Sequence, residues 1–372
     1  MGRWSMRARR AHDGGGGITS WTATAPPQAA DPEHPLEPTD ATSRVVPDPG
    51  GPTSRIPPLD ELEPRAQAPT HSNTRSIRAP IVAIANQKGG VGKTTTAVSL
   101  AAALAQLGAR VLLVDLDPQG NATTGLGLRA EQGEPSTYGV LVEDLAVAEA
   151  TIATEVDGLE LVPSSLDLAG AEVELVPAFS RELRLQRALA TIGDRYDVVF
   201  VDCPPSLGLL TINALVAADE VLVPIQCEYY ALEGLGQLMR TVQLVGDNLN
   251  RDLSLGGVVL TMFDGRTNLS QQVVDEVRGY FGERAYRTVI PRTVRLSEAP
   301  SFGQPITVFD PGSRGSRAYL RLAREVAERL ALRVELPEES PLDRLLNGGP
   351  AAGVPGTEGD TRDVPEDEEA AP

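Results

Sequence analysis

A glycine-rich segment that holds two lysines constrains this chain more than any other feature of its sequence. The segment reads Lys88-Gly89-Gly90-Val91-Gly92-Lys93-Thr94-Thr95-Thr96. It follows a short apolar run at residues 81–85 and leads into an alanine-rich stretch at residues 95–106. The apolar run is typical of a buried parallel strand, and the alanine-rich stretch favours a helix. The sequence therefore predicts a strand, a tight loop and a helix in succession, which is the setting of a phosphate-binding loop.

Lysine usage supports the same interpretation. Of the 33 basic residues in the chain, Lys88 and Lys93 are the only two lysines. Arginine is a planar fork, whereas lysine is a compact charge on a flexible stem. Because the chain keeps lysine in this loop alone, we expect the loop to require ammonium groups.

The motif is a deviant form of the phosphate-binding loop. The plain pattern is Gly-x-x-x-x-Gly-Lys-[Ser/Thr], and its first position falls here on Gln87. The physics is the same, because small residues let successive backbone N–H groups and the following helix terminus face phosphate oxygens. Lys93 would contact the β- and γ-phosphates, and the Thr94 hydroxyl would bind Mg²⁺. We therefore predict that residues 88–95 bind a nucleotide.

Two more apolar runs end in acidic residues. Residues 110–115 end in Asp115 and are closely followed by Asp117, and residues 198–202 end in Asp202. A carboxylate at a strand end beside the loop can hold Mg²⁺ through water or position an attacking water. One such Asp alone is more often a helix cap or a turn residue. Several strand ends that meet at one nucleotide crevice favour the functional interpretation.

The remaining pattern predicts the fold class. Apolar runs that suit strands alternate with segments of helical spacing, which indicates a mostly parallel twisted α/β sheet with helices on both faces. The further strands are expected at 220–224 and 257–261, and helices at 207–217, 232–245, 269–281 and 316–332. Two stretches, 118–133 and 291–315, lack clear apolar periodicity, and we expect them to be functional loops.

Taken together, these motifs resemble the ParA/Soj chromosome-partitioning ATPases, which belong to the deviant Walker A class of P-loop NTPases that includes MinD. The resemblance covers roughly residues 79–334. It is carried by the lysine-containing loop, by residues 224–234 and 260–268, and by three further motifs. These are Val114-Asp115-Leu116-Asp117-Pro118-Gln119-Gly120-Asn121, Asp202-Cys203-Pro204-Pro205-Ser206-Leu207-Gly208 and Pro291-Arg292-Thr293-Val294-Arg295-Leu296-Ser297-Glu298-Ala299-Pro300-Ser301-Phe302-Gly303.

The resemblance implies a role for each matching residue of the site. Lys88 is similar to a signature lysine that crosses a dimer interface to the partner's phosphates, and Lys93 to the phosphate-loop lysine. Thr94 matches the magnesium ligand, and Asp202 a carboxylate that holds the ion through water. Asp117 matches the residue that orients the hydrolytic water.

The resemblance also implies where other ligands bind. Arg266 and Arg295 match arginines that bind DNA non-specifically, and Pro291 belongs to a stretch that lies near the adenine. Four arginines in or just after the second long loop independently favour a phosphate-binding face there. They are Arg292, Arg295, Arg314 and Arg317.

The implied function is an ATP-dependent switch. ATP with Mg²⁺ would drive a homodimer that binds DNA, and a ParB-like centromere-binding partner would stimulate an otherwise slow hydrolysis and release it. A second ammonium, supplied by the other subunit, can neutralise charge that develops in phosphoryl transfer. ATP binding and dimerisation of the chain would then be coupled. We expect such a protein to be cytoplasmic and associated with the nucleoid.

Composition predicts three parts in the chain. Residues 1–78 are rich in Pro, Gly, Ser and Thr and are expected to be a disordered extension, although Trp4 and Trp21 leave room for a docking motif. Residues 79–336 would form the ATPase domain, and residues 337–372, with ten acids against two arginines, an acidic disordered tail. The net charge is −18 for the chain and −10 for the middle part, from 22 basic and 32 acidic residues. We therefore expect weak, salt-sensitive DNA binding.

Three other functions fit the sequence less well. A membrane-targeted regulator of the MinD kind would end in a basic amphipathic helix, but this chain ends in an acidic run. No apolar stretch approaches the length of a membrane span, and no signal core follows the N-terminal arginines. An iron–sulfur electron-transfer ATPase needs suitably placed thiolates, and Cys203 and Cys227 do not match; we expect both to be buried and reduced. No substrate motif supports a metabolic kinase.

Overall fold

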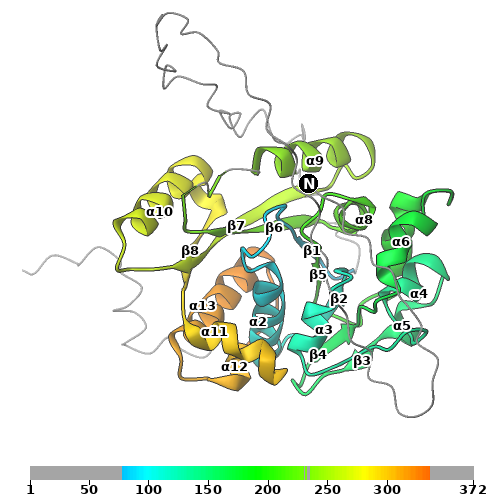
Figure 1. The fold of residues 1–372 in the computed structure, drawn as a ribbon, viewed down its shortest axis with the longest axis horizontal. Coiled ribbons are helices and arrows are strands. Elements are labelled where there is room, and N and C mark those ends of the chain that lie inside the picture. The colour runs from blue at the N-terminus through cyan, green and yellow to red at the C-terminus, as the bar shows by residue number, and fades with distance from the viewer. Residues whose placement is uncertain (1–77, 230, 233–234, 336–372) are drawn as a thin grey trace, which may run out of the picture. The chain divides into compact units, whose positions relative to one another are not determined.

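A single sheet organises the part of the chain that the computed structural model describes, which comprises residues 78–229, 231–232 and 235–335. The eight strands lie in the order β3-β4-β2-β5-β1-β6-β7-β8 (Figure 1). The pairing of β3 with β4 is antiparallel, and the other six pairings are parallel. The predicted fold class, a mostly parallel sheet covered by helices, is confirmed.

The strands alternate with helices along most of the described chain. The strands are β1 (Ile81–Ile84), β2 (Val111–Asp115), β3 (Ile152–Ala153), β4 (Leu159–Val162), β5 (Val198–Asp202), β6 (Glu220–Gln226), β7 (Ser254–Phe263) and β8 (Ala285–Pro291). The longer helices are α2 (Lys93–Gln106), α8 (Leu209–Ala217), α9 (Leu235–Asn248), α10 (Asn268–Phe281) and α13 (Arg314–Arg329). The shorter ones are α3 (Asn121–Gly125), α4 (Thr137–Val142), α5 (Val147–Ala150), α6 (Leu168–Glu174), α7 (Arg184–Leu189), α11 (Val294–Glu298) and α12 (Ile306–Phe309), with 3-10 turns η1 (Arg181–Leu183), η2 (Gly282–Arg284) and η3 (Ala299–Phe302).

The central strands are buried on both faces, as their unbroken apolar sequences predict. In β1, Ile81 and Ala83 belong to the core on one side of the sheet, and Val82 and Ile84 to the core on the other. This division follows from the two-residue period of a strand. Helices α2 and α13 pack on one face, and α8, α9 and α10 on the other (Figure 1). Each fully buried aliphatic side chain contributes about 1.5–3 kcal/mol.

The two stretches expected to be long loops are partly helical, which corrects the sequence prediction. Residues 118–133 contain α3, and residues 291–315 contain α11, η3 and α12. Helices of four or five residues complete little more than one turn, so a 3.6-residue apolar period cannot show in their sequences. The Thr293 side chain accepts a hydrogen bond from the Leu296 N–H at 3.3 Å and thereby caps α11.

Of the remaining sequence predictions, the one for the cysteines is confirmed and the one for the two terminal segments stays untested. Both thiols, Cys203 and Cys227, are buried and free of disulfides, as predicted. The expected disordered segments 1–78 and 337–372 lie, apart from residue 78, outside the described residues, so the limits of the ATPase domain at 79–336 stay a prediction. In the described ranges, no helix has the length and apolar character needed to cross a bilayer.

Candidate nucleotide site

The loop between β1 and α2 is anchored to the two strands beside it. The Asn86 side chain donates to the Pro224 carbonyl at 2.7 Å and accepts from the Lys88 N–H at 2.9 Å. The Thr261 hydroxyl donates to the Val91 carbonyl at 2.8 Å. These bonds connect the loop to the ends of β6 and β7. The loop is therefore held in one conformation before any ligand binds, which reduces the entropic cost of binding.

Two glycines give the loop its shape. Gly90 and Gly92 have φ angles of +74° and +90°, in the left-handed region that side chains with a Cβ disfavour. Helix α2 begins at Lys93, immediately after this turn, and its first intrahelical bond runs from the Thr96 N–H to the Gly92 carbonyl at 2.9 Å. The earlier N–H groups at the helix start have no intrahelical acceptor. The turn and the helix terminus together form a site suited to phosphate.

Lys93 is the first residue of α2, and its side chain is buried. Only 6% of the residue is exposed, and its Nζ donates to the Lys88 carbonyl at 3.3 Å. Burial lowers the pKa of the Lys93 ammonium, and the charge of Asp202 opposes that shift. The ammonium thus has one weak, long hydrogen bond that a phosphate oxygen could replace.

The strand register brings two acidic residues side by side. Asp115, at the end of β2, is the direct neighbour of Asp202, at the end of β5. The Asp115 carboxylate accepts hydrogen bonds from the Thr123 N–H and hydroxyl at 2.8 and 2.7 Å and from the Asp117 N–H at 3.2 Å. Burial raises the pKa of Asp115 to about 6, and the Thr123 hydrogen bonds oppose that shift. With its oxygens already engaged, Asp115 acts as an anchor for the segment that follows β2.

Asp202 differs from Asp115 because its carboxylate is both buried and unpartnered. The residue is fully buried, and neither oxygen forms a hydrogen bond with a described residue. Burial, followed by the charge of Asp115, raises its pKa well above the usual range, and Thr94 and Lys93 oppose the shift. A buried carboxylate without donors is costly unless a cation or ordered water accompanies it. This unpartnered acid beside Thr94 fits a magnesium ion held through water.

The described residues contain no group of three His, Cys, Asp or Glu side chains that could hold a metal ion. Mg²⁺ commonly takes one or two protein ligands and completes its octahedron with water and substrate phosphates. The donor set here suits an ion that arrives with a nucleotide.

Asp117 lies in a tight turn after β2 and lines the site. One of its carboxylate oxygens accepts the Gln119 N–H at 3.0 Å, and its carbonyl accepts the Ser164 hydroxyl at 2.7 Å and the Gly120 N–H at 2.9 Å. The second oxygen, Oδ2, makes no hydrogen bond to any residue that the structure describes. The residue is 6% exposed. Its backbone is thus fixed while one carboxylate oxygen stays available.

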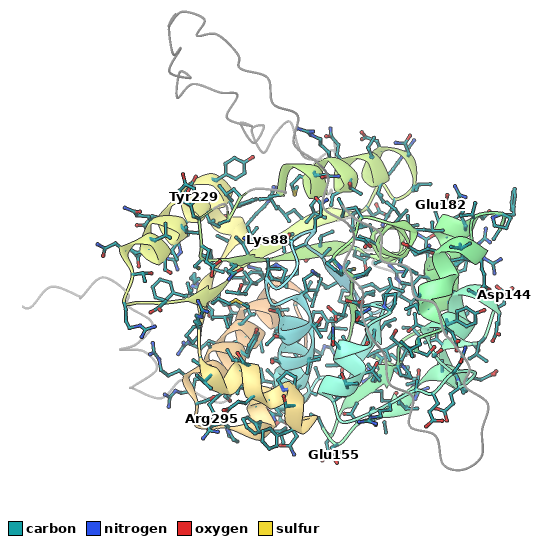
Figure 2. The ribbon with its side chains drawn as sticks, in the orientation of Figure 1. Lys88, Asp144, Glu155, Glu182, Tyr229 and Arg295 are labelled. Atoms are coloured by element: carbon teal, nitrogen blue, oxygen red, sulfur yellow. The ribbon has the colours of Figure 1, made fainter. Side chains whose placement is uncertain are left out.

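The glycine turn, the start of α2 and Asp117 line one cavity of about 430 Å³, a volume typical of small-molecule sites. Among the residues predicted to bind nucleotide or act on it, those lining the cavity are Gly89, Gly90, Gly92, Lys93, Thr94, Thr95 and Asp117. The other predicted residues, Lys88, Val91, Asp202 and Pro291, do not line it. Lys88 lies in the β1–α2 loop (Figure 2) and is partly exposed, and its ammonium has no hydrogen-bond or ion-pair partner within the described ranges.

The opposite wall of the cavity was missed by sequence reasoning. It includes Met262 at the end of β7 and four residues of the α11–η3 segment and the turn after it, namely Leu296, Ala299, Pro300 and Gln304. Pro291 ends β8 and lies outside this wall, so its proximity to the adenine stays a prediction. The sequence signal was present, because Leu296, Ala299 and Pro300 belong to the motif that runs from Pro291 to Gly303, and Gln304 directly follows it.

The candidate DNA-binding arginines already have acidic neighbours. Arg266 forms two hydrogen bonds with the Asp264 carboxylate, at 2.8 and 2.6 Å, and this holds the pKa of Asp264 below its usual range. Arg295 lies 3.1 Å from Glu298 and 3.3 Å from Asp310. A phosphate would have to compete with these carboxylates, which favours weak, salt-sensitive binding.

A close backbone contact joins the two segments that face each other across the cavity. Gly127 follows α3, Gly303 follows η3, and a Cβ added at Gly303 would lie 2.6 Å from the Gly127 Cα. Gly303 also has a φ of +65°. We expect Gly303→Ala to destabilise the protein by roughly 1–3 kcal/mol for the backbone strain and about as much again for the clash. Gly282→Ala is the matched control, since Gly282 has a φ of +53° and open space around its Cβ position. Thermal unfolding that showed equal losses for both variants would contradict the contact.

Comparison with known proteins identifies relatives of this chain. The AAA domain family matches residues 79–255. The sporulation initiation inhibitor protein Soj of Bacillus subtilis is 60% identical over 247 residues, which cover 66% of this chain and 98% of that protein. The chromosome partitioning protein ParA of Myxococcus xanthus is 55% identical over 249 residues, with 67% of this chain and 88% of that protein covered.

Solved structures share the fold. A structure from Mycobacterium smegmatis described as cobyrinic acid a,c-diamide synthase with bound ADP and magnesium is 40% identical, has a TM-score of 0.59, and covers 71% of this chain and 100% of its own. The septum site-determining protein MinD of Pyrococcus horikoshii, complexed with Mg-ADP, is 24% identical with a TM-score of 0.54, and the match covers 67% of this chain and 96% of that one.

Proposed function

Because the chain belongs to the ParA/Soj family of chromosome-partitioning ATPases, we propose that it is an ATP-dependent switch that binds and releases DNA. The observation that carries this proposal is that buried Lys93 and Asp117 line one cavity, while the unpartnered carboxylate of Asp202 lies close enough for its charge to act on Lys93. Phosphoryl transfer to water requires a positive charge on the phosphates, an acidic residue that helps to hold Mg²⁺, and a residue that positions the attacking water.

The residues suggest how the protein would act on ATP. The loop N–H groups and Lys93 would hold the β- and γ-phosphates, and Thr94 and Asp202 would hold Mg²⁺. The ion supplies charge neutralisation on the phosphate oxygens when bound. Asp117, with its backbone fixed and Oδ2 unpaired, would orient a water towards the γ-phosphate. The nucleotide-bound structures of the M. smegmatis relative support ATP and Mg²⁺ as cofactors.

The partly exposed ammonium of Lys88 supports a dimeric active form. It lies outside the cavity of its own chain and has no described partner to hold it. In a sandwich dimer it would reach the phosphates of the second subunit and make hydrolysis depend on pairing. We infer slow hydrolysis by the single chain for that reason.

DNA and a centromere-binding partner complete the proposal. ATP-bound dimers would present two copies of the Arg266 and Arg295 region to DNA, and two weak sites act together with high effective concentration. A ParB-like partner would stimulate hydrolysis and so release the dimer. We infer that the protein associates with the nucleoid.

A DNA-retention assay tests this proposal. Purified protein would be passed over immobilised non-specific DNA with ATP, ADP or no nucleotide, across a salt series. We expect retention with ATP alone and a steep loss as salt rises. ATP turnover without ATP-dependent retention would leave an ATPase but remove the partitioning role.

Reversing the charge of Arg295 should separate DNA binding from ATP binding. We expect Arg295→Glu to reduce DNA retention at least about tenfold, because a dimer would lose two phosphate contacts and gain two repulsive charges. ATP affinity should be unchanged. The matched control is Arg251→Glu. Arg251 is also exposed, but it precedes β7 whereas Arg266 follows β7, so the two arginines lie at opposite ends of that strand. Equal retention by both variants would refute the proposed DNA face.

A further inference from the structure

Helix α6 and the turns on either side of it expose several large apolar side chains. The residues are Leu166, Val173, Val176 and Phe179, with exposed fractions of 78%, 74%, 59% and 91%. The opposite side of the same helix is anchored in the core through Leu168, Ala171 and Leu175. Val173 lies in α6, and Leu166, Val176 and Phe179 lie in the turns that flank it, so the four exposed side chains belong to one short segment. We name these four residues the α6 face. Exposed apolar groups gathered in this way mark interaction sites.

The sequence around the α6 face is mainly acidic, and the basic residues that lie there are Arg181, which donates to the Val176 carbonyl, and Arg184, which pairs with Asp144. Between Arg129 and Arg181 the sequence has no lysine, arginine or histidine. The acidic residues in this stretch number eleven: Glu131, Glu134, Glu143, Asp144, Glu149, Glu155, Asp157, Glu160, Asp167, Glu172 and Glu174. Helices α4, α5 and α6 lie on one flank of the sheet, and Asp144 and Glu182 lie on that flank, whereas Arg295 lies on the other (Figures 1 and 2). The stretch between Arg129 and Arg181 therefore carries a net negative charge at neutral pH.

This charge selects among the possible occupants of the face. DNA and anionic lipid would both be repelled. A second copy of this chain in a twofold contact would set the acidic surface against itself, since such contacts are self-complementary. We propose that the α6 face is the docking surface for a basic, amphipathic segment of a partner protein. Apolar side chains of that segment would cover the face while its basic residues pair with the acidic rim.

The face is connected to both acidic strand ends of the nucleotide site. Ser164, two residues before Leu166, donates to the Asp117 carbonyl at 2.7 Å. Glu172 of α6 accepts the Leu210 N–H at 3.4 Å, at the start of the helix that follows Asp202. A segment bound at the α6 face could therefore shift the elements that position Asp117 and Asp202. Taking the docked protein to be the one that stimulates hydrolysis rests on the proposed function above.

The test uses the full chain, ATP and the purified centromere-binding partner. The variant Val173→Ala with Phe179→Ala removes apolar surface that is solvent-exposed, so it should fold normally. We expect its affinity for the partner to fall about tenfold or more, as for central contact residues of an interface. Stimulated hydrolysis at low partner concentration should fall in parallel. Leu244→Ala, at an exposed apolar residue of α9, is the matched control and should bind as the wild type does.

Several outcomes would overturn the proposal. Unchanged partner affinity in the double variant would do so, and so would affinity that does not weaken as salt rises. Impaired ATP-dependent dimerisation with normal partner binding would show that the face contacts a second copy instead. Basal hydrolysis and DNA retention should match the wild type. DNA retention by the wild-type chain is measured first. If the wild type is not retained in the presence of ATP, the proposed function fails, independently of any result with the α6 variants.

Discussion

The Lys93→Ala variant is expected to lose measurable ATP binding. The Lys93 ammonium is the buried positive charge of the cavity, and it would form charge-assisted hydrogen bonds with the β- and γ-phosphates. Two such bonds are worth roughly 3 kcal/mol or more, which corresponds to an affinity loss of at least about a hundredfold. Isothermal titration with ATP and Mg²⁺ would measure it. Near-normal affinity in a folded variant would remove the phosphate-loop assignment.

The second lysine provides the control for the first. Lys88→Ala removes the same charge five positions away, from a side chain that does not line the cavity. We expect it to bind ATP nearly as the wild type does, but to stay monomeric by sedimentation and to hydrolyse ATP poorly. Circular dichroism would check that Lys93→Ala still folds, because that change leaves the buried Asp202 carboxylate without its neighbouring cation. If Lys88→Ala formed normal ATP-bound dimers, Lys88 would have no role across the subunits.

The Asp117→Ala variant is expected to bind ATP and yet hydrolyse it about 10² to 10⁴ times more slowly, the usual contribution of a group that positions or deprotonates the nucleophile. ATP-bound dimers would then persist on DNA. Single-turnover hydrolysis and the DNA-retention assay would both report this. Normal turnover would exclude the assigned role.

Asp117→Asn separates chemistry from structure. Asp117 accepts the Gln119 N–H, so alanine also removes a bond that shapes the turn. Asparagine keeps that acceptor but loses the charge. Slow hydrolysis in both variants would support a chemical role of the Asp117 carboxylate. Slow hydrolysis in Asp117→Ala alone would indicate a structural role. Asp157→Ala is the matched control, because exposed Asp157 precedes β4 and so lies at the sheet edge opposite the cavity.

Local patterns in the sequence were sufficient to predict the central part of the fold. The strands at 81–84, 111–115 and 198–202 are unbroken apolar runs, and such runs belong to strands buried on both faces. The edge elements were harder. Strand β8 reads Ala-Tyr-Arg-Thr-Val-Ile-Pro and mixes polar with apolar residues, and β3 has two residues only, so neither carries a clear pattern.

The acidic neighbours of Arg266 and Arg295 could not be predicted with certainty from spacing. Asp264 is near Arg266 in sequence, but Asp310 approaches Arg295 from fifteen positions away, through the folding of α11, η3 and α12. The acidic stretch between Arg129 and Arg181 was visible in the sequence. Its meaning emerged once the four apolar side chains of the α6 face were known to be exposed.

The local sequence is enough to predict which groups this protein brings to one site: a glycine turn with two lysines, acids at or just after strand ends, and a parallel sheet that carries them. These are local properties, since a turn, a strand and a helix start each depend on a few consecutive residues. The tertiary structure alone decided that Asp202 is unpartnered while Asp115 is satisfied, and that Leu296 and Gln304 close the cavity. Strand register and the packing of distant segments fix those relations, and neither is written in the neighbouring sequence.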